Sequence, residues 1–131
     1  MLSPADVAAK FDGIGQGKAD LCIHQAVLLG ILAGMYIALA AVGANTGGSM
    51  MDNLGVAKII SSLIFPAGLA MVVLAGSELF TGDCLMLIAK LDNRITWGKM
   101  LRLWVIVYIG NLAGSILVAF LMTQAQQLSL F

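Results

Sequence analysis

Three long apolar stretches dominate the pattern of the chain. They run over Ala26–Ala44, Ile59–Ala89 and Leu103–Met122, and polar residues lie before and between them. Because about 20 helical residues cross the hydrocarbon core of a bilayer, the first and third stretches predict simple membrane spans. We expect these spans at residues 25–44 and 100–123.

The second stretch is too long for one simple span. As a continuous helix it would extend roughly 46 Å, whereas the hydrocarbon core is about 30 Å thick. It also contains two carboxylates, Glu78 and Asp83. The pattern therefore predicts a broken span over 58–90, with a kink at Pro66 and a loop near 78–83.

On either side of this loop we expect two helices, from Lys58 to Ser77 and from Cys84 to Lys90. Unwound backbone at membrane depth has unpaired N–H and C=O groups, so it persists only where it is buried in protein or lines a polar cavity. Broken helices of this kind mark transport sites in membrane proteins.

The composition favours a membrane protein over a soluble domain. Hydrophobic residues make up 60% of the chain and charged residues 11%, and the 7 Lys and Arg balance the 7 Asp and Glu. A soluble domain of this length cannot bury so much apolar surface. The zero net charge leaves no basic field for a nucleic acid partner. We expect one all-α integral membrane domain over residues 1–131, with the lipid bilayer as its surroundings.

The basic residues predict the orientation of the chain. With three spans, the N-terminal segment 1–24 and the connection before the third span lie on the same side. That side holds every basic residue except Lys58, namely Lys10, Lys18, Lys90, Arg94, Lys99 and Arg102. By the positive-inside rule the N-terminus is cytoplasmic, and the tail 124–131 faces outward.

Small residues predict close packing between the first and third spans. Gly30 and Gly34 form one GxxxG pattern, and Gly110 and Gly114 form another. Such patterns let helix backbones approach closely in membranes. Asn111, a polar residue inside the third span, is expected to hydrogen-bond between helices.

The GSELFTG stretch at 76–82 closely resembles the first signature of the formate/nitrite transporter family of anion channels. Further likenesses follow in order along the chain: LSPAD at 2–6, GILAG at 30–34, RITWG at 94–98 and YIGNLAG at 108–114. The resemblance covers essentially the whole chain. Family members have six spans, built as two three-span repeats of opposite orientation, and this chain resembles the first repeat. Its one histidine, His24, does not match the pore histidine of the second repeat.

The resemblance implies half of an aquaporin-like inverted-repeat channel. The other half would come from a longer form of the chain or from a second-half chain, and the full-length form would be a homopentamer in a prokaryotic plasma (inner) membrane. The substrate would be a small monovalent anion or its conjugate weak acid, such as formate, nitrite or hydrosulfide. Transport of this kind needs no redox or hydrolytic chemistry, so we expect no enzyme activity, no cofactor and no metal.

The candidate site residues gather around the predicted break. By resemblance, Leu79 and Phe80 match the apolar constriction of the pore, and Thr81 supplies a hydroxyl beside it. Phe65 and Leu69 match pore-facing apolar positions and share a helix face. The alternatives are core or lipid packing for the apolar residues, and a bond to the loop's own backbone for Thr81.

The two carboxylates are expected to structure the loop. An ionisable residue at membrane depth is a functional hypothesis by default. A negative charge on an anion path would oppose permeation, so we expect Glu78 to accept hydrogen bonds from loop N–H groups. We expect Asp83 to cap the short helix that follows it.

The expected mechanism is selection by dry, apolar constrictions. A bare anion enters such a gap at high cost, and a weak acid that has gained a proton enters far more easily. Two other functions stay open at this point. One is a small proton-coupled multidrug-type exporter that uses Glu78, and the other is a truncated structural membrane subunit without transport.

Overall fold

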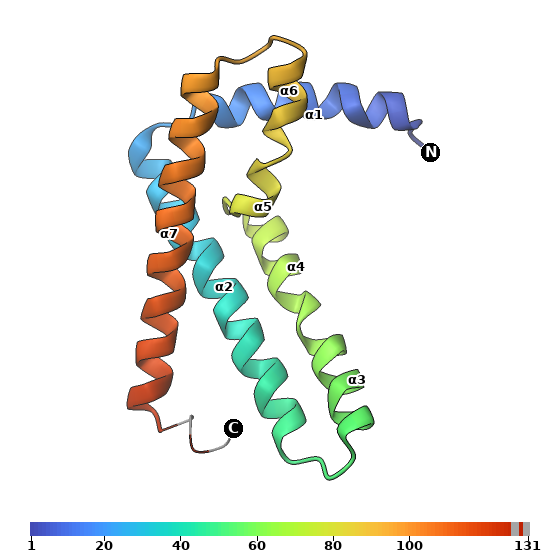
Figure 1. Cartoon of the computed structure of the whole chain (residues 1–131), viewed down its shortest axis with the longest axis vertical. Coiled ribbons are helices and arrows are strands. Elements are labelled where there is room, and N and C mark those ends of the chain that lie inside the picture. The colour runs from blue at the N-terminus through green and yellow to red at the C-terminus, as the bar shows by residue number, and fades with distance from the viewer. Residues whose placement is uncertain (127–128, 130–131) are drawn as a thin grey trace.

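The computed structural model describes residues 1–126 and 129, and within them the chain is helical with no strand (Figure 1). The helices in chain order are α1 (Pro4–Ala19), α2 (Ile23–Ser49), α3 (Leu54–Ile64), α4 (Pro66–Ala75), α5 (Phe80–Asp83), α6 (Met86–Leu91) and α7 (Trp97–Gln124). Of the predicted outer tail 124–131, residues 127, 128, 130 and 131 lie outside the described residues.

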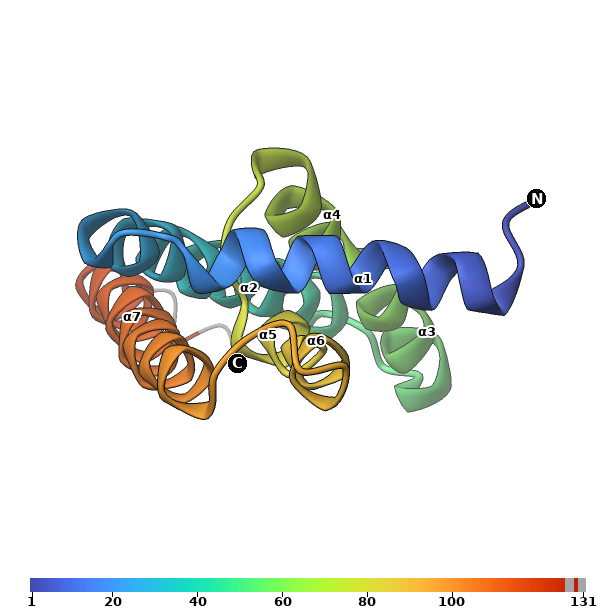
Figure 2. The same ribbon diagram turned by 90° about the horizontal axis from the view of Figure 1, so that it is seen from above.

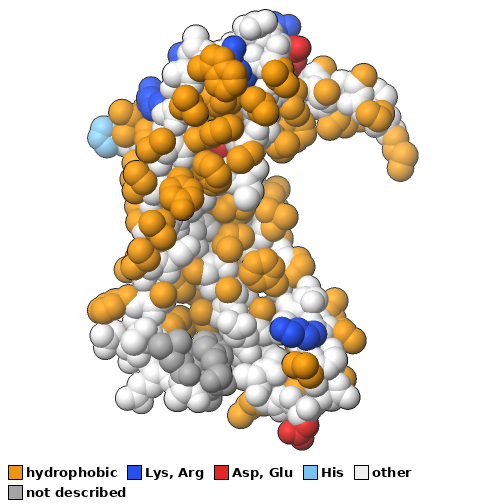
Figure 3. Space-filling model, in the orientation of Figure 1, with side chains coloured by type: hydrophobic (Ala, Val, Ile, Leu, Met, Phe, Trp, Pro, Cys, Tyr) orange, Lys and Arg blue, Asp and Glu red, His pale blue; other side chains and the backbone are white. Residues whose placement is uncertain are grey.

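Three segments are long and apolar enough to cross a membrane: α2, the α3–α4 pair over Leu54–Ala75, and α7. Figure 3 shows hydrophobic side chains over the sides of the molecule, with charged side chains gathered towards its two ends. Such a large apolar surface is unfavourable in water, but it is favourable in the hydrocarbon core of a bilayer. The predicted all-α membrane class with three spans is confirmed.

The first and third spans pack closely through their glycines, as predicted. Gly30 and Gly110 lie against each other's backbone, so that a Cβ on either would come within 3.2–3.5 Å of main-chain atoms. Gly34 and Gly114 allow still closer approach, because a Cβ there would lie 2.1 Å from the carbonyl oxygens of Asn111 and Ile31. Backbone contact of this kind is the dominant packing device between membrane helices, which gain little from hydrophobic burial.

The second span is interrupted twice. The first interruption lies at Phe65, where α3 ends and Pro66 begins α4, as the proline predicts. The second begins at Gly76, whose φ of 64° is left-handed and ends α4. The non-helical part is shorter than the predicted loop 78–83, because residues 80–83 form the single turn α5 before α6.

The N-terminal segment is a helix that lies across one end of the three spans (Figures 1 and 2). Ser3 caps α1: its side chain accepts from the N–H of Asp6, and the Asp6 carboxylate accepts from the N–H of Ser3 in return. Buried residues of α1, α2, α6, α7 and the α6–α7 connection form a core at this end: Ala19, Ala26, Met86, Ala89, Ile95, Met100, Leu103 and Val107. This core holds α1 over the break in the second span.

Candidate functional site

The break in the second span is held by hydrogen bonds from neighbouring helices. The N–H of Ser77 returns to the carbonyl of Val72 (3.0 Å), which closes the end of α4. The N–H of Glu78 donates to the carbonyl of Leu29 on α2 (3.3 Å). The unwound backbone therefore meets the condition for irregular structure at membrane depth, since protein groups satisfy it.

Asn111 on α7 links the break to both neighbouring spans. Its Oδ1 accepts from the N–H of Phe80 (3.0 Å), while its Nδ2 donates to the carbonyls of Gly30 (2.8 Å) and Glu78 (3.0 Å). The amide of Asn111 thus joins α2, α7 and the unwound segment at one point. The expected interhelical hydrogen bond of Asn111 is confirmed, and its contact with the break goes beyond that expectation.

A cavity of about 650 Å³ lies between α1, α4 and the break. Its walls are mainly apolar, with Lys18, Glu78, Ser77 and Thr81 as the polar contributions. The full lining is Phe11, Ile14, Lys18, Leu69, Val72, Val73, Gly76, Ser77, Glu78, Leu79, Thr81 and Gly82. Such a volume exceeds what a small monovalent ion with several waters needs.

Lys18 of α1 forms an ion-paired cluster with the two carboxylates of the break. Its Nζ donates to Oε2 of Glu78 and, at 2.7 Å, to Oδ1 of Asp83. The Lys18 side chain is 22% exposed, that of Glu78 9%, and that of Asp83 0%. Burial by itself lowers the pKa of Lys18, but the hydrogen bonds to Asp83 and Glu78 outweigh it and raise that pKa above the ordinary lysine value.

The expected cap role of Asp83 is wrong. Asp83 is the last residue of α5, and α6 begins after Leu85 with no side chain capping it. The carboxylate instead binds Lys18, because an unpaired buried charge costs far more than an uncapped helix end. Glu78 likewise binds Lys18 through its carboxylate, while the loop N–H groups of Glu78 and Phe80 bond to Leu29 and Asn111.

The structure brings some of the candidate pore residues together and separates others. Leu69, Leu79 and Thr81 line the same cavity. Phe80 points to the other side of the break and packs edge-on against Trp104 and Tyr108, with ring centroids 6.0 and 5.5 Å away.

Phe65 lies apart from this group, in a different hollow beside Ala44, Lys58 and Ser61. Its position at the junction of α3 and α4 puts it ahead of the first turn of α4, away from the break. The helical spacing that links Phe65 to Leu69 in sequence therefore does not carry both side chains into one cavity.

Three residues of this region have roles that sequence reasoning missed. From the sequence, Lys18 indicates only the orientation of the chain in the membrane, and neither Trp104 nor Asn111 is expected to contact the break. The Trp104 Nε1 donates to the main-chain oxygen of Asp83 (2.9 Å), which fixes the end of α5. A signal for Lys18 existed, because two carboxylates in an apolar stretch require a cation from elsewhere.

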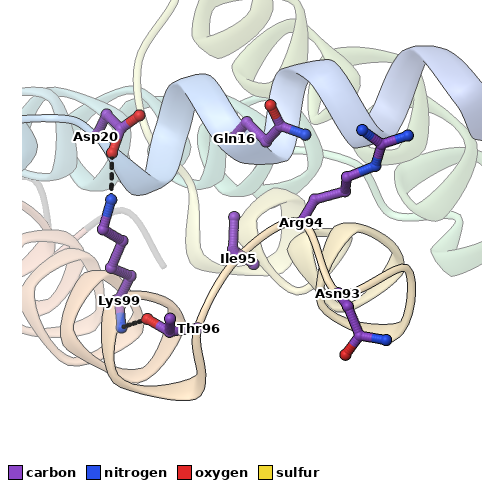
Figure 4. A pocket seen from close by; sticks show the side chains of 7 residues that line it. All are labelled: Gln16, Asp20, Asn93, Arg94, Ile95, Thr96 and Lys99. Atoms are coloured by element: carbon purple, nitrogen blue, oxygen red, sulfur yellow. Dashed lines mark hydrogen bonds and ion pairs between the residues drawn. The ribbon is translucent and has the colours of Figure 1, made fainter.

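A second, smaller pocket of about 210 Å³ lies where α1 meets the connection from α6 to α7 (Figure 4). There Asp20 and Lys99 point towards one another and form an exposed ion pair at 2.6 Å. Nearby, a hydrogen bond to Asp92, together with burial, raises the pKa of Asp12, and Arg94 opposes that rise. These contacts hold α1 to the α6–α7 connection.

The described residues contain no group of three or more His, Cys, Asp or Glu side chains that is placed to hold a metal ion. The side chains that line the cavity supply one ammonium, one carboxyl group, two hydroxyls and apolar walls.

Comparison with known proteins yields one consistent result. A family model described as formate/nitrite transporter matches residues 5–130. The chain is 38% identical over 125 residues to the formate channel FocA of Escherichia coli (strain K12), covering 93% of this chain and 44% of the relative. It is 38% identical over 128 residues to a probable formate transporter of Methanothermobacter thermautotrophicus, covering 94% and 47%. The chain thus spans about half the length of these relatives.

Proposed function

The chain belongs to the formate/nitrite transporter family, and we propose on this basis that it forms the first three-span part of a channel for small monovalent anions or their conjugate weak acids. Formate is the first substrate to consider, since the names of the E. coli and Methanothermobacter relatives specify it. Nitrite and hydrosulfide, which are also small monovalent anions, would be the next substrates to test. The protein would act as a transporter and not as an enzyme.

The observation that carries this proposal is the broken second span beside a cavity. The break exposes Leu79 and Thr81 to the cavity, next to the ammonium group of Lys18. The apolar walls of the cavity favour the neutral acid over the bare anion. Leu79 would narrow the path on the cavity side of the break and Phe80 on its other side. Thr81 would donate a hydrogen bond to the substrate, and Leu69 would extend the apolar wall.

We also propose how the chain sits in the membrane. The end that holds α1 and the connection from α6 to α7 would face the cytoplasm, because nearly all basic residues lie there. The surroundings would be a prokaryotic plasma (inner) membrane. The full-length form would be a homopentamer, with the second repeat supplied by a longer chain or a partner chain.

The exporter alternative is disfavoured by the state of Glu78. A drug-binding carboxylate must be free to exchange a cationic substrate for a proton, but Glu78 is already held by Lys18. The structural-subunit alternative predicts no transport, so a transport measurement distinguishes it from the proposed channel.

A chimera tests the proposal. This chain replaces the matching 44% of the E. coli formate channel, and the chimera is reconstituted into liposomes for a formate-uptake measurement. We expect formate uptake above that of empty liposomes, and a strong reduction when Leu79→Trp fills the proposed constriction. A folded, pentameric chimera that takes up no formate would overturn the proposal.

A further inference from the structure

The Lys18–Glu78–Asp83 cluster carries more negative than positive charge. Two carboxyl groups share one ammonium: Lys18 Nζ donates to Oε2 of Glu78 and to Oδ1 of Asp83. All three side chains are mostly buried, and Asp83 is buried completely. If both carboxyl groups were ionised, the cluster would hold an uncompensated negative charge away from water, which is strongly unfavourable.

No ion pair among the described residues joins the cluster to a further cation. Three other cations near this end are engaged elsewhere: Lys99 with Asp20, Arg102 with the carbonyl of Leu21, and Lys90 over the ring of Trp97. The groups that α7 brings to the break, Trp104 and Asn111, are uncharged and bind main-chain atoms. The cluster must therefore balance its own charge.

A proton on one of the two carboxyl groups would balance the charge of the cluster. The carboxyl groups of Glu78 and Asp83 both bind the same Nζ atom of Lys18, so they lie close together, and a proton on either one would remove the excess charge. Oδ2 of Asp83 is buried and has no donor among the described residues. A carboxyl oxygen in that situation is the natural place for a proton.

We propose that the Lys18–Glu78–Asp83 cluster is a proton-binding site. At neutral pH it holds one exchangeable proton on its two carboxyl groups and donates that proton to an anion in the cavity. Glu78 and Lys18 line the cavity, so the anion reaches the cluster directly. An anion that enters the cavity meets the Lys18 ammonium beside the protonated carboxyl group. The carboxyl O–H bond breaks as an O–H bond forms on the anion, and the two carboxylates then share Lys18 until the proton is replaced.

The neutral acid then passes the apolar break. A hydronium ion from the solution on the α1 side protonates the cluster again and leaves as water. Atoms and charge balance in each step, with no further reactant. This inference rests on the proposed transport function for the identity of the anion, but the proton-binding site itself is defined by the cluster alone.

Infrared spectroscopy of the chain in lipid nanodiscs tests the site without a transport assay. We expect a band from one protonated carboxyl group per chain at neutral pH. Asp83→Asn leaves one carboxylate against one ammonium, so the band should disappear; Glu78→Gln should have the same effect. Lys18→Gln removes the cation, so the band should persist to higher pH than in the wild type.

Asp20→Asn is the matched control, since it removes the same charge from an exposed ion pair and should leave the band unchanged. Wild-type chain without a protonated carboxyl at neutral pH would overturn the proposal, even if every variant failed to fold. Adding sodium formate should perturb the wild-type band, and a band that formate leaves unchanged would refute the transfer to the anion. A formate-conducting chimera without the band refutes the proton site alone, whereas the band without conduction refutes the proposed function alone.

Discussion

Replacing Gly34 by alanine is the sharpest test of how the first and third spans support the break. A Cβ at this position would lie 2.1 Å from the main-chain oxygen of Asn111. An ordinary carbon–oxygen contact is about 3.3 Å, so α2 and α7 must separate by about 1.2 Å at this point. The obstacle is backbone, which cannot rotate away as a side chain would.

The separation reaches the break through the side chain of Asn111. This amide donates to the carbonyl of Gly30 at 2.8 Å and to that of Glu78 at 3.0 Å. Stretching these contacts by about 1 Å takes them beyond hydrogen-bonding distance. Overpacking costs about 1–3 kcal/mol and each lost hydrogen bond about 1 kcal/mol, so we expect a loss of roughly 3–5 kcal/mol in the free energy of unfolding.

Gly43→Ala is the matched control, because it lies in the same helix and its Cβ would meet only a side-chain atom of Ile64, at 3.4 Å. Both substitutions gain the same helix propensity, so their difference isolates the clash. The assay is equilibrium unfolding by SDS in mixed micelles, followed by circular dichroism. Unfolding free energies of Gly34→Ala and Gly43→Ala that agree within about 0.5 kcal/mol would refute the reasoning.

Three further predictions concern the break and α1. Asn111→Ala removes the acceptor of the Phe80 N–H, so we expect amide exchange at Phe80 to accelerate at least about tenfold, measured by hydrogen–deuterium exchange. Gly76→Ala forces a side chain into a left-handed backbone with φ of 64° and should cost about 1 kcal/mol in SDS unfolding. The pKa of Asp12 is raised above 3.8 by its hydrogen bond to Asp92 and by burial, so the contact between α1 and the α6–α7 connection is strongest below that value and weakens as pH rises through the raised pKa. A spin-label distance between α1 and α6 should then increase with pH, and Asp92→Asn should remove this dependence.

Each of these predictions has a control and an opposing outcome. Ser115→Ala, on the same helix as Asn111, loses hydrogen bonds to the carbonyls of Gly34 and Asn111 but none to the break. Equal exchange at Phe80 in both variants would contradict the role of Asn111. Gly82→Ala should be neutral, because its Cβ also meets open space but its φ is ordinary. A distance between α1 and α6 that is constant with pH in the wild type would count against the Asp12–Asp92 contact.

Much of the fold was predictable from local patterns. Long apolar stretches indicate membrane spans, because a bilayer excludes charge over a fixed thickness. Pro66 indicates a kink, because it removes one main-chain hydrogen-bond donor. The GxxxG pairs predicted the close approach of α2 and α7, which the structure bears out through Gly34 and Gly114. The helix over 4–19 was not predicted, because its large apolar residues are few. Its position over the break depends on contacts with other helices.

The candidate site was predictable only in part. The position of the break followed from Glu78, Asp83 and the glycines beside them, but its exact extent did not, because α5 forms from residues with no strong helix preference. Leu69, Leu79 and Thr81 share a cavity as their candidacy required, while Phe65 lies elsewhere. Their roles in the pore stay predictions.

The membrane class, the three spans, the break in the second span and the family could all be inferred from the amino-acid sequence. Each of these depends on residues close together in the chain, where helical period and composition act directly. Only the tertiary structure decided which groups complete the break: Lys18 reaches Glu78 across a separation of 60 residues, and Asn111 reaches Phe80 across 31. Buried charges and unpaired main-chain groups require partners, but the requirement does not specify which partner, and only the packing of α1 and α7 against the break supplies it.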